Sequence, residues 1–367
     1  MTSEGPTGKQ PQSPGLLERL AQGPVICAEG YLFELERRGY LQAGPFVPEV
    51  VLENPDAVRQ LHREFVRAGS DVVEAFTYYG HREKLRVIDK EDLLEPLNRK
   101  ALAIAAEVAR ESGALFAGNI CNTNVWEADK PETHRAARAM FEEQVGWAVE
   151  AGVDYIIGET FSWQAEALAA LEAIQAAGKP AVITFALGNQ GQLHDAEPVA
   201  ACARLAEAGA DVVGLNCLRG PATMLPIVEK LRAAVSCHVA ALPVPYRTTD
   251  RAPTFFAFED PACDCLPEGR AFPSALDPFA CNRYEMGAFA AKAYEIGVRY
   301  LGVCCGAGPH HIRAVAEALG RHPPASRYSP DMSKHAYLGT DPAIPEAYKR
   351  FGRSDRSPAV PRQSPSD

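Results

Sequence analysis

Arg67-Ala68-Gly69-Ser70-Asp71-Val72-Val73 is one of four stretches in which a helix-like run ends in glycine and a short β-branched strand follows at once. The other three are Glu150-Ala151-Gly152-Val153-Asp154-Tyr155-Ile156-Ile157, Glu207-Ala208-Gly209-Ala210-Asp211-Val212-Val213 and Glu295-Ile296-Gly297-Val298-Arg299-Tyr300-Leu301. Glycine readily adopts the left-handed conformation just past a helix end, and only a few residues then separate the helix from the next strand. These joints predict a chain of alternating helices and strands.

Working outward from the joints gives eight predicted strands. They are expected at residues 25–27, 72–76, 115–119, 155–159, 181–185, 212–216, 238–242 and 300–303. Helical windows lie between them, such as 55–68, where Asn54 is the expected N-cap and Pro55 opens the first turn. Eight strands alternating with helices over about 300 residues predict a (β/α)8 TIM barrel. The alternative is an open, doubly wound parallel sheet, because periodicity alone does not show that the sheet closes into a barrel.

The barrel prediction divides the chain into three parts. Residues 16–322 are expected to form the catalytic barrel, residues 1–15 a flexible N-terminal tail, and residues 323–367 a C-terminal extension that ends in a disordered tail at residues 353–367. Within the barrel, residues 244–283 form a long connection after the seventh predicted strand. Loops that follow barrel strands lie over the active-site mouth, so we expect this loop to act as a lid.

Charge and composition exclude several classes of protein. The formal net charge is −10 and no block of Lys or Arg interrupts it, so we expect no nucleic-acid partner. Charges break every apolar stretch well before ~18 residues, and the N-terminus is polar, so we expect neither a membrane span nor a cleaved signal. Ten cysteines in 367 residues indicate reduced thiols rather than a disulfide framework. Together these features predict a cytoplasmic protein.

Three cysteines stand directly after predicted strands, where the side chains of a barrel face the active site. Cys217 follows the sixth strand, and the adjacent pair Cys304 and Cys305 follows the eighth. Only one strand separates these two, so the three sulfurs could converge on one metal ion. Three thiolate ligands with a fourth position open suit zinc. Because three thiolates make the metal site electron-rich, the site favours activation of a substrate thiol over hydrolysis. The alternatives are that the adjacent cysteines are merely small buried residues or form a vicinal disulfide.

Carboxylates and aromatic side chains occupy comparable positions. Glu29 follows the first strand and Glu159 ends the fourth. A carboxylate in a barrel mouth needs a cation, and an α-amino group would serve, although a solvated loop glutamate is the alternative for each. The aromatic residues at the second strand end and in the loop before it are Phe46, Phe76, Tyr78 and Tyr79. Their ring faces could hold a quaternary ammonium or sulfonium group at roughly 0.5–2 kcal/mol per contact, although such a run also suits a core.

At this point the motifs resemble those of betaine-homocysteine S-methyltransferase and its homocysteine methyltransferase relatives. The likeness covers residues 25–324. Its most specific stretches are LERRGY at 35–40, AVRQLHREF at 57–65, NC at 216–217 and GVRYLGVCCG at 297–306. Chance does not readily produce so many stretches in one order.

The resemblance implies a barrel enzyme in which Zn²⁺ on Cys217, Cys304 and Cys305 binds the sulfur of homocysteine. The thiolate then takes a methyl group from an onium donor and becomes methionine. The resemblance places Glu29 and Glu159 at the homocysteine amino group. The further substrate-binding positions are Gly30 and Asn216 for homocysteine and Phe46, Phe76, Tyr78, Tyr79 and Thr160 for the donor.

Two departures from the betaine enzyme concern the donor. Phe46 stands where that enzyme has Trp, and Thr160 where it has Tyr; in addition, Glu29 replaces its usual Asp. Glycine betaine is the first donor that the resemblance implies, and the sulfonium compounds dimethylsulfoniopropionate and S-methylmethionine are the alternatives. The family uses its C-terminal extension in assembly, so a homo-oligomer is expected, although the extension is shorter here and only residues 327–334 resemble its end.

Two rival functions stay open. A barrel aldolase or hydrolase would use Glu159 and His194 and would be active without zinc. A non-catalytic zinc- or thiol-binding protein would bind homocysteine but form no methionine. Cys263 and Cys265 in the long loop have a spacing that sometimes binds metal, but no further ligand is evident beside them, so we expect free surface thiols.

Overall fold

The computed structural model describes residues 14–354. Most of the predicted N-terminal tail (1–13) and the end of the predicted disordered tail (355–367) lie outside the described residues. Contacts divide the chain into two units, the first ending at Pro324 and the second beginning at Ala325.

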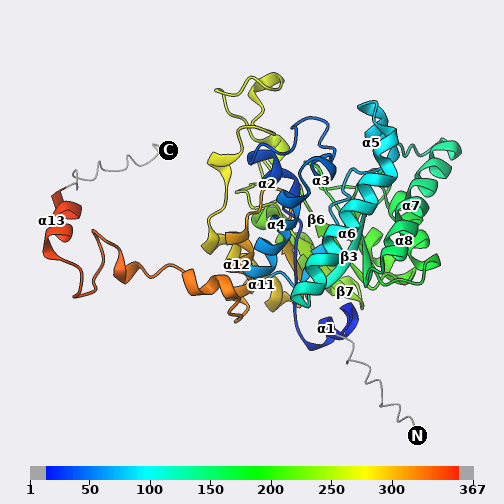
Figure 1. The fold of residues 1–367 in the computed structure, drawn as a ribbon. Coiled ribbons are helices and arrows are strands. Elements are labelled where there is room, and N and C mark those ends of the chain that lie inside the picture. Colours follow the sequence, from blue (N-terminus) through cyan, green and yellow to red (C-terminus); the bar gives the residue numbers. More distant parts are fainter. Residues whose placement is uncertain (1–13, 355–367) are drawn as a thin grey trace, which may run out of the picture. The chain divides into compact units, whose positions relative to one another are not determined.

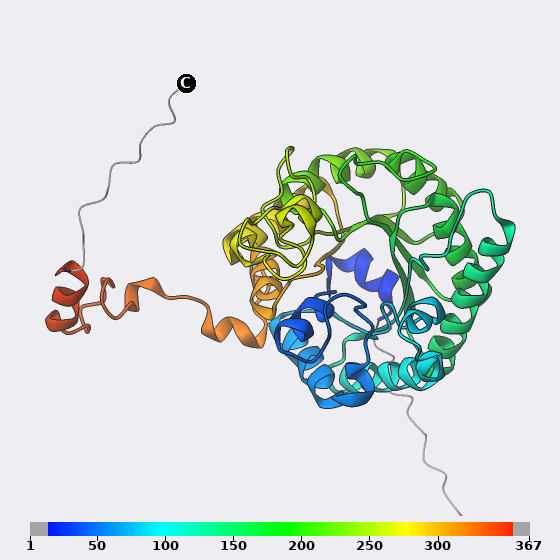
Figure 2. The same ribbon diagram turned by 90° about the horizontal axis from the view of Figure 1, so that it is seen from above.

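Eight parallel strands form a ring at the centre of the first unit (Figure 2). Their bounds are β1 Val25–Ala28, β2 Val72–Glu74, β3 Leu115–Cys121, β4 Tyr155–Phe161, β5 Ala181–Phe185, β6 Val212–Asn216, β7 His238–Leu242 and β8 Tyr300–Val303. From β2 to β8 each strand pairs with the next, and β8 pairs with β1. This order is that of a (β/α)8 TIM barrel, and it excludes the doubly wound alternative.

The last four strands lie at the predicted residues, and the earlier ones differ at their ends. The prediction for β2 is wrong at residues 75–76, because the chain bends there: the Thr77 N–H donates to the Ala75 carbonyl at 2.7 Å. By contrast, β1 continues one residue beyond its predicted end, and β3 and β4 each continue two residues further.

Helices alternate with the strands and cover the outside of the ring (Figure 1). They are α2 Tyr31–Arg37, α3 Val50–Glu53, α4 Pro55–Ala68, α5 Arg82–Val87, α6 Leu94–Ser112, α7 Pro131–Ala151, α8 Gln164–Ala176, α9 Pro198–Glu207, α10 Pro221–Ala234, α11 Arg283–Ile296 and α12 Pro309–Ala318, with 3-10 turns at Glu91–Leu93, Phe255–Ala257, Pro267–Gly269 and Asp277–Phe279. The predicted helix 55–68 is α4.

The glycine joints form as the sequence predicts. Gly69, Gly152, Gly209 and Gly297 follow α4, α7, α9 and α11 with φ of +117°, +84°, +95° and +103°. Because a side chain at such φ values is strained, glycine is the residue that lets each helix end and the chain turn at once into the next strand.

The aspartate in three of these joints ties neighbouring strands together. Each carboxylate accepts a hydrogen bond from a backbone N–H at the start of the adjacent strand. The pairs are Asp71 with Ile26 (2.8 Å), Asp154 with Phe116 (2.8 Å) and Asp211 with Ala181 (2.9 Å). The Asp71 N–H also donates to the Ile26 carbonyl at 2.8 Å, so this joint links β1 and β2, the two ends of the strand order.

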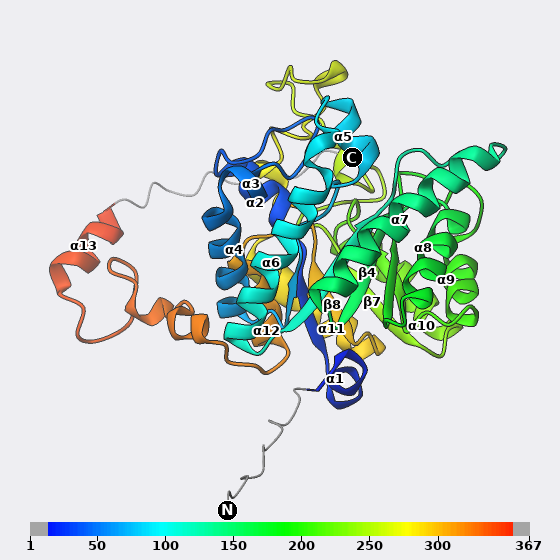
Figure 3. The same ribbon diagram turned by 45° about the vertical axis from the view of Figure 1, so that its right-hand side comes forward.

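The amino-terminal half of the barrel interior is filled and closed. Its apolar residues are Leu16, Leu20, Val25, Cys27, Val72, Leu115, Ala117, Tyr155, Ile157, Val182, Val212, Ala240, Leu242 and Tyr300, here called the barrel floor. Leu16 and Leu20 belong to α1 (Leu16–Gln22), which lies across that end of the barrel (Figure 3). Within residues 14–354, the two cavities described below lie instead toward the carboxyl ends of the strands.

The second unit contains little regular structure. It holds the helix α13 Glu346–Ser354 and the 3-10 turn Met332–Lys334. A further 3-10 turn, Pro324–Tyr328, begins at the boundary between the units. The helix α13 includes the first two residues of the segment 353–367 predicted to be disordered. Within residues 14–354, no helix is long and apolar enough to cross a bilayer.

Candidate active site

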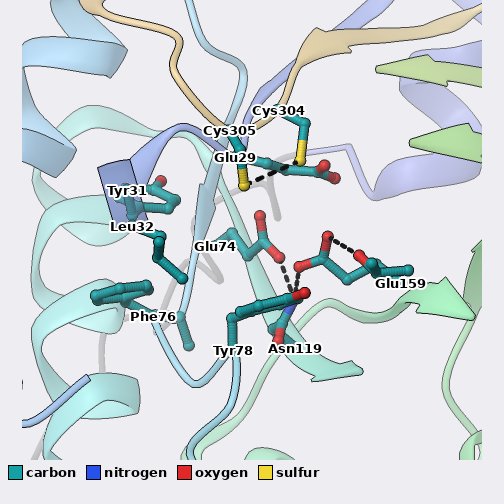
Figure 4. Close-up of a pocket in the computed structure, with 12 residues that line it drawn as sticks. Glu29, Tyr31, Leu32, Glu74, Phe76, Tyr78, Asn119, Glu159, Cys304 and Cys305 are labelled. Atoms are coloured by element: carbon teal, nitrogen blue, oxygen red, sulfur yellow. Dashed lines mark hydrogen bonds between the residues drawn. The ribbon is translucent and has the colours of Figure 1, made fainter. Parts of the chain in front are cut away.

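Cys217, Cys304 and Cys305 come together at the mouth of the barrel. Their three sulfur atoms lie within 4.8 Å of one another. The sulfurs of Cys304 and Cys305 are 3.9 Å apart (Figure 4), far beyond the ~2.05 Å of a disulfide bond. All three thiols are free, so the vicinal disulfide considered for the pair is not formed. The cluster could hold a metal ion that prefers sulfur ligands.

An unusual backbone turn places Cys217 in this cluster. Cys217 and Leu218, directly after β6, have φ of +54° and +52°, a conformation that non-glycine residues rarely adopt. The Cys217 N–H donates to the Leu242 carbonyl on β7 at 3.0 Å, and the Cys304 N–H donates to the Pro243 carbonyl at 3.0 Å. Strain of this kind persists where the surroundings enforce it, and it is common at functional sites. Hydrogen bonds from Cys304 and Cys305 lower the pKa of Cys217 well below its usual value.

Three buried carboxylates lie beside the thiols (Figure 4). Glu29, Glu74 and Glu159 are only 6%, 3% and 4% exposed. The side-chain amide of Asn119 donates to Glu159 Oε1 at 2.6 Å and also to Glu74 Oε1. Carboxylate oxygens of Glu29 and Glu159 and the sulfur of Cys304 lie within 4.8 Å of one another. The carboxylate group and the thiol cluster are therefore parts of one site.

Asn216 connects these two parts. Its amide nitrogen donates to Glu159 Oε2 at 2.6 Å and lies 3.9 Å from the Cys304 sulfur. Its carbonyl oxygen accepts from the Thr160 N–H and from the Thr184 hydroxyl, both at 3.0 Å. With all of its side-chain atoms engaged, Asn216 fixes the orientation of the Glu159 carboxylate relative to the thiols.

Burial and mutual repulsion shape the charge of the carboxylates. Burial, together with the charges of Glu159 and Glu74, raises the pKa of Glu29 well above its usual value. Burial raises the pKa of Glu159 to about 7, although hydrogen bonds from Asn119, Thr160 and Asn216 oppose the shift. Neither oxygen of Glu29 has a hydrogen-bond partner among residues 14–354. Since an uncompensated buried carboxylate is costly, this pocket is suited to receive a cation.

Two cavities meet at the thiols. The smaller, of about 20 Å³, is lined by the three carboxylates, Asn119, Thr160, Cys304 and Cys305 together with aromatic and aliphatic neighbours. The larger, of about 220 Å³, is lined by Cys217 and Cys305 and by a group of aromatic side chains. These are Phe33, Phe46, Tyr78, Tyr79, Phe255, Phe256 and Phe272. The last three come from the long loop 244–283 (Figure 1, yellow), so this loop contributes to the wall of the larger cavity.

Most residues singled out from the sequence lie at these two cavities. Phe76 lines the smaller one and Phe46 and Tyr79 the larger, while Tyr78 and Thr160 line both. Gly30 lines neither cavity. It is the N-cap residue of α2, and a Cβ there would lie 2.3 Å from the Ala307 carbonyl oxygen, so only glycine lets the backbone approach Ala307 this closely.

Two other groups of residues singled out from the sequence do not line these cavities. His194 packs its ring on Trp163, with centroids 4.6 Å apart, and it is not among the residues that line the cavity of Glu159. The pair Cys263 and Cys265 contacts Ser274, whose hydroxyl lies 2.9 Å from the Cys265 sulfur, and both cysteines are free thiols.

Glu74 and Asn119 are the main residues of the smaller cavity that are not among the site residues predicted from the sequence. A signal for them exists in the period of two that places alternate strand residues on one face. The floor residues Val72 and Ala117 are each followed two positions later by a polar residue, which is Glu74 in β2 and Asn119 in β3. The same step leads from Ile157 to Glu159.

Comparison with known proteins identifies the family. The family model described as homocysteine S-methyltransferase matches residues 26–319. The chain belongs to this family. As a member of the homocysteine S-methyltransferase family it is a methyltransferase, and the match covers all eight strands except the first residue of β1.

Curated proteins align with most of the chain. Betaine–homocysteine S-methyltransferase 1 of Danio rerio is 41% identical over 338 residues, which are 89% of this chain and 80% of that protein. The enzyme of the same name from Bos taurus is 39% identical, covering 86% of this chain and 77% of that protein. S-methylmethionine–homocysteine S-methyltransferase BHMT2 of Pongo abelii is 38% identical, covering 91% and 89%. Relatives named for two different donors are thus almost equally similar to this chain.

Solved structures of similar fold include the homocysteine methyltransferase MmuM from Escherichia coli in its metallated form. It is 20% identical, has a TM-score of 0.62, and the match covers 81% of this chain and 97% of that one. At this identity the likeness supports the barrel fold and its arrangement of strands.

Proposed function

We propose that this methyltransferase transfers a methyl group from an onium donor to the sulfur of homocysteine, giving methionine, with glycine betaine as the first donor. The observation that carries the proposal is that the thiol cluster stands between a cavity of carboxylates and a cavity of aromatic rings. An amino acid held by its ammonium in the first cavity and an onium group held in the second would bring sulfur and methyl carbon together. Placing two reactants in this way is a large part of catalysis for a single displacement.

We assign Zn²⁺ to Cys217, Cys304 and Cys305. The fit rests on three sulfur atoms within 4.8 Å of one another, since an all-thiolate ligand set suits zinc and leaves a fourth position for a substrate. When bound, the ion would supply acidity to an incoming thiol, whose free pKa is about 8.5, so that no general base is needed.

The side chains of the protein position the two substrates. Glu29 and Glu159 accept hydrogen bonds from the ammonium group of homocysteine, and Asn216 keeps Glu159 in place through its 2.6 Å hydrogen bond. Aromatic faces in the larger cavity attract the positive charge of the donor. The leaving group is a neutral amine or sulfide, so it departs without a general acid.

A sulfonium donor is the second candidate. It is favoured by the similarity to the Pongo abelii protein, which is named for S-methylmethionine and matches this chain over 91% of its length. Phe46 and Thr160, which stand at donor-facing positions, line the larger cavity and would take part in the choice.

The test is methionine formation by zinc-loaded protein given homocysteine and, separately, glycine betaine, dimethylsulfoniopropionate or S-methylmethionine. Turnover with one donor supports the proposal and identifies that donor. No turnover with any of them, while zinc stays bound, contradicts it and favours a protein that binds the metal and the thiol without catalysis.

We also propose a cytoplasmic setting, because all ten cysteines are free and such thiols persist in a reducing compartment. Assembly into a homo-oligomer stays a prediction from the resemblance.

A further inference from the structure

A third buried carboxylate in the smaller cavity has no part in the function proposed above. Glu74, at the end of β2, is 3% exposed. One of its oxygens accepts a hydrogen bond from the Asn119 amide, and the other lies 4.0 Å from the Cys27 sulfur. Glu74 carries a carboxyl group into a deeply buried part of the site, where its ionised form is costly unless it meets a cation.

The three carboxylates surround one small space. Carboxylate oxygens of Glu29 and Glu74 lie within 4.8 Å of each other and of the Cys27 sulfur, and Glu29 is as close to Glu159. Asn119 holds Glu74 and Glu159 through the two hydrogens of a single amide nitrogen. Figure 4 shows the three side chains, from β2, β4 and the end of β1, turned toward the same space. The cavity between them measures about 20 Å³, which is room for one group of the size of water.

The unpartnered oxygens of Glu29 indicate that this space is built for a ligand. Both are buried and have no hydrogen-bond partner in the part of the chain that the structure describes. Glu159 is already bound at both oxygens, since Asn119 donates to Oε1 and both Asn216 and Thr160 donate to Oε2. Asn119 uses only Oε1 of Glu74, so acceptor positions stay open on Glu74. The space therefore offers several acceptor positions on its carboxylates.

We propose that Glu74 is the third acceptor for the ammonium group of homocysteine and makes the site selective for thiols that carry a primary amine. An ammonium group has three N–H donors, and three carboxylates from three strands match that number. A carboxylate placed in the same space would be repelled by all three side chains. Glu74 therefore also favours entry of the ammonium group of the amino acid over entry of its α-carboxylate. The inference rests on the proposed function, since it takes the acceptor to bind in this cavity.

The experiment measures binding rather than turnover, so no donor is needed. Zinc-loaded wild-type protein and the Glu74→Gln variant are titrated calorimetrically with homocysteine and with 4-mercaptobutanoate, the same chain without the amine. We expect Glu74→Gln to weaken homocysteine binding by about tenfold or more, because a hydrogen bond to a charged group is lost. Binding of 4-mercaptobutanoate should stay unchanged or become tighter, because a repulsive charge is removed.

Glu166→Gln is the matched control. Glu166 is 2% exposed and accepts hydrogen bonds from Thr123, but it does not line the cavity. Its loss should leave the ratio of the two affinities as in the wild type. Should Glu74→Gln not fold, Glu74→Asp keeps the charge but draws it back by one methylene, and it should reduce the preference for homocysteine severalfold.

Several outcomes would overturn the inference. An unchanged affinity ratio in Glu74→Gln, or in Glu74→Asp where that variant replaces it, shows that Glu74 does not meet the ammonium. Equal weakening of both ligands indicates a structural role alone. Competition between potassium chloride and homocysteine that disappears in Glu74→Gln indicates a metal cation in this space. Failure of wild-type protein to bind either thiol counts instead against the proposed function.

Discussion

Replacing His62 by leucine is expected to make the barrel less sensitive to acid. His62 lies on α4, is 1% exposed, and neither ring nitrogen has a hydrogen-bond partner within residues 14–354. Burial lowers its pKa to about 3, from the usual value of 6.5. Because the folded state keeps the ring neutral, the unfolded state binds one more proton below pH 6.5. Protonation of His62 in the unfolded state therefore lowers the free energy of unfolding progressively as the pH falls from 6.5 toward 3.

The size of this effect follows from the two pKa values. At pH 5, which is 1.5 units below the pKa in the unfolded chain, the loss is about 2 kcal/mol at ~1.36 kcal/mol per unit. At pH 7 it is close to zero. The His62→Leu variant has no ring to protonate, so the difference in unfolding free energy between variant and wild type should shift by about 2 kcal/mol from pH 7 to pH 5.

Urea unfolding followed by circular dichroism at the two pH values measures this shift. His322→Leu serves as the control, since His322 is exposed and its surroundings change little on unfolding. Leucine retains apolar contact with Tyr31, whose ring packs on His62 with centroids 4.8 Å apart. Equal pH dependence of wild type and His62→Leu would refute the reasoning, because it would mean that His62 gains a partner or reaches solvent in the folded protein.

Three further predictions concern the site and its support. Cys217→Ala should abolish both zinc retention, measured by metal analysis, and methionine formation, whereas Cys202→Ala, at a buried thiol outside the cluster, should retain both; activity in metal-free protein would contradict the zinc assignment. Phe272→Ala should raise the KM for the donor by roughly two- to thirtyfold with little change in the KM for homocysteine, since it removes one ring from the larger cavity. Gly302→Ala should lower the melting temperature, because its Cβ would lie 2.0 Å from a carbonyl oxygen of β1, while Gly146→Ala, with open space around it in α7, should raise the melting temperature slightly.

The fold could be predicted because its joints are local. In each repeat the glycine marks the helix end and the residues just after it mark the start of the strand, so β6 and β8 begin at their predicted residues. The structure adds why aspartate recurs there: the Asp71 and Asp154 carboxylates each bind the backbone of the adjacent strand at 2.8 Å. Strand ends were less predictable, because β2 stops where the chain bends, and that bend depends on its tertiary surroundings.

The thiol cluster could also be predicted from the sequence, since Cys217, Cys304 and Cys305 follow strands that a barrel places near each other. The aromatic residues of the long loop that line the larger cavity could not be predicted in this way. Phe255, Phe256 and Phe272 have no periodic spacing, and loop residues so far apart in sequence reach one cavity only through the folded path of residues 244–283. Composition suggests a covering loop, but it does not say which rings face inward.

Glu74 shows why the smaller cavity was only half predicted. Within its own strand, the period of two places Glu74 on the same face as the floor residue Val72, but it does not say which side chains meet Glu74 there. Its position depends on the stagger of the barrel: Glu74 pairs with Ala117 across β2 and β3, and Asn119 pairs with Ile157 across β3 and β4. This stagger brings Asn119 between Glu74 and Glu159, so that one amide binds carboxylates from two non-adjacent strands. The charge of the site is therefore a property of the register between strands, which no single stretch of the sequence contains.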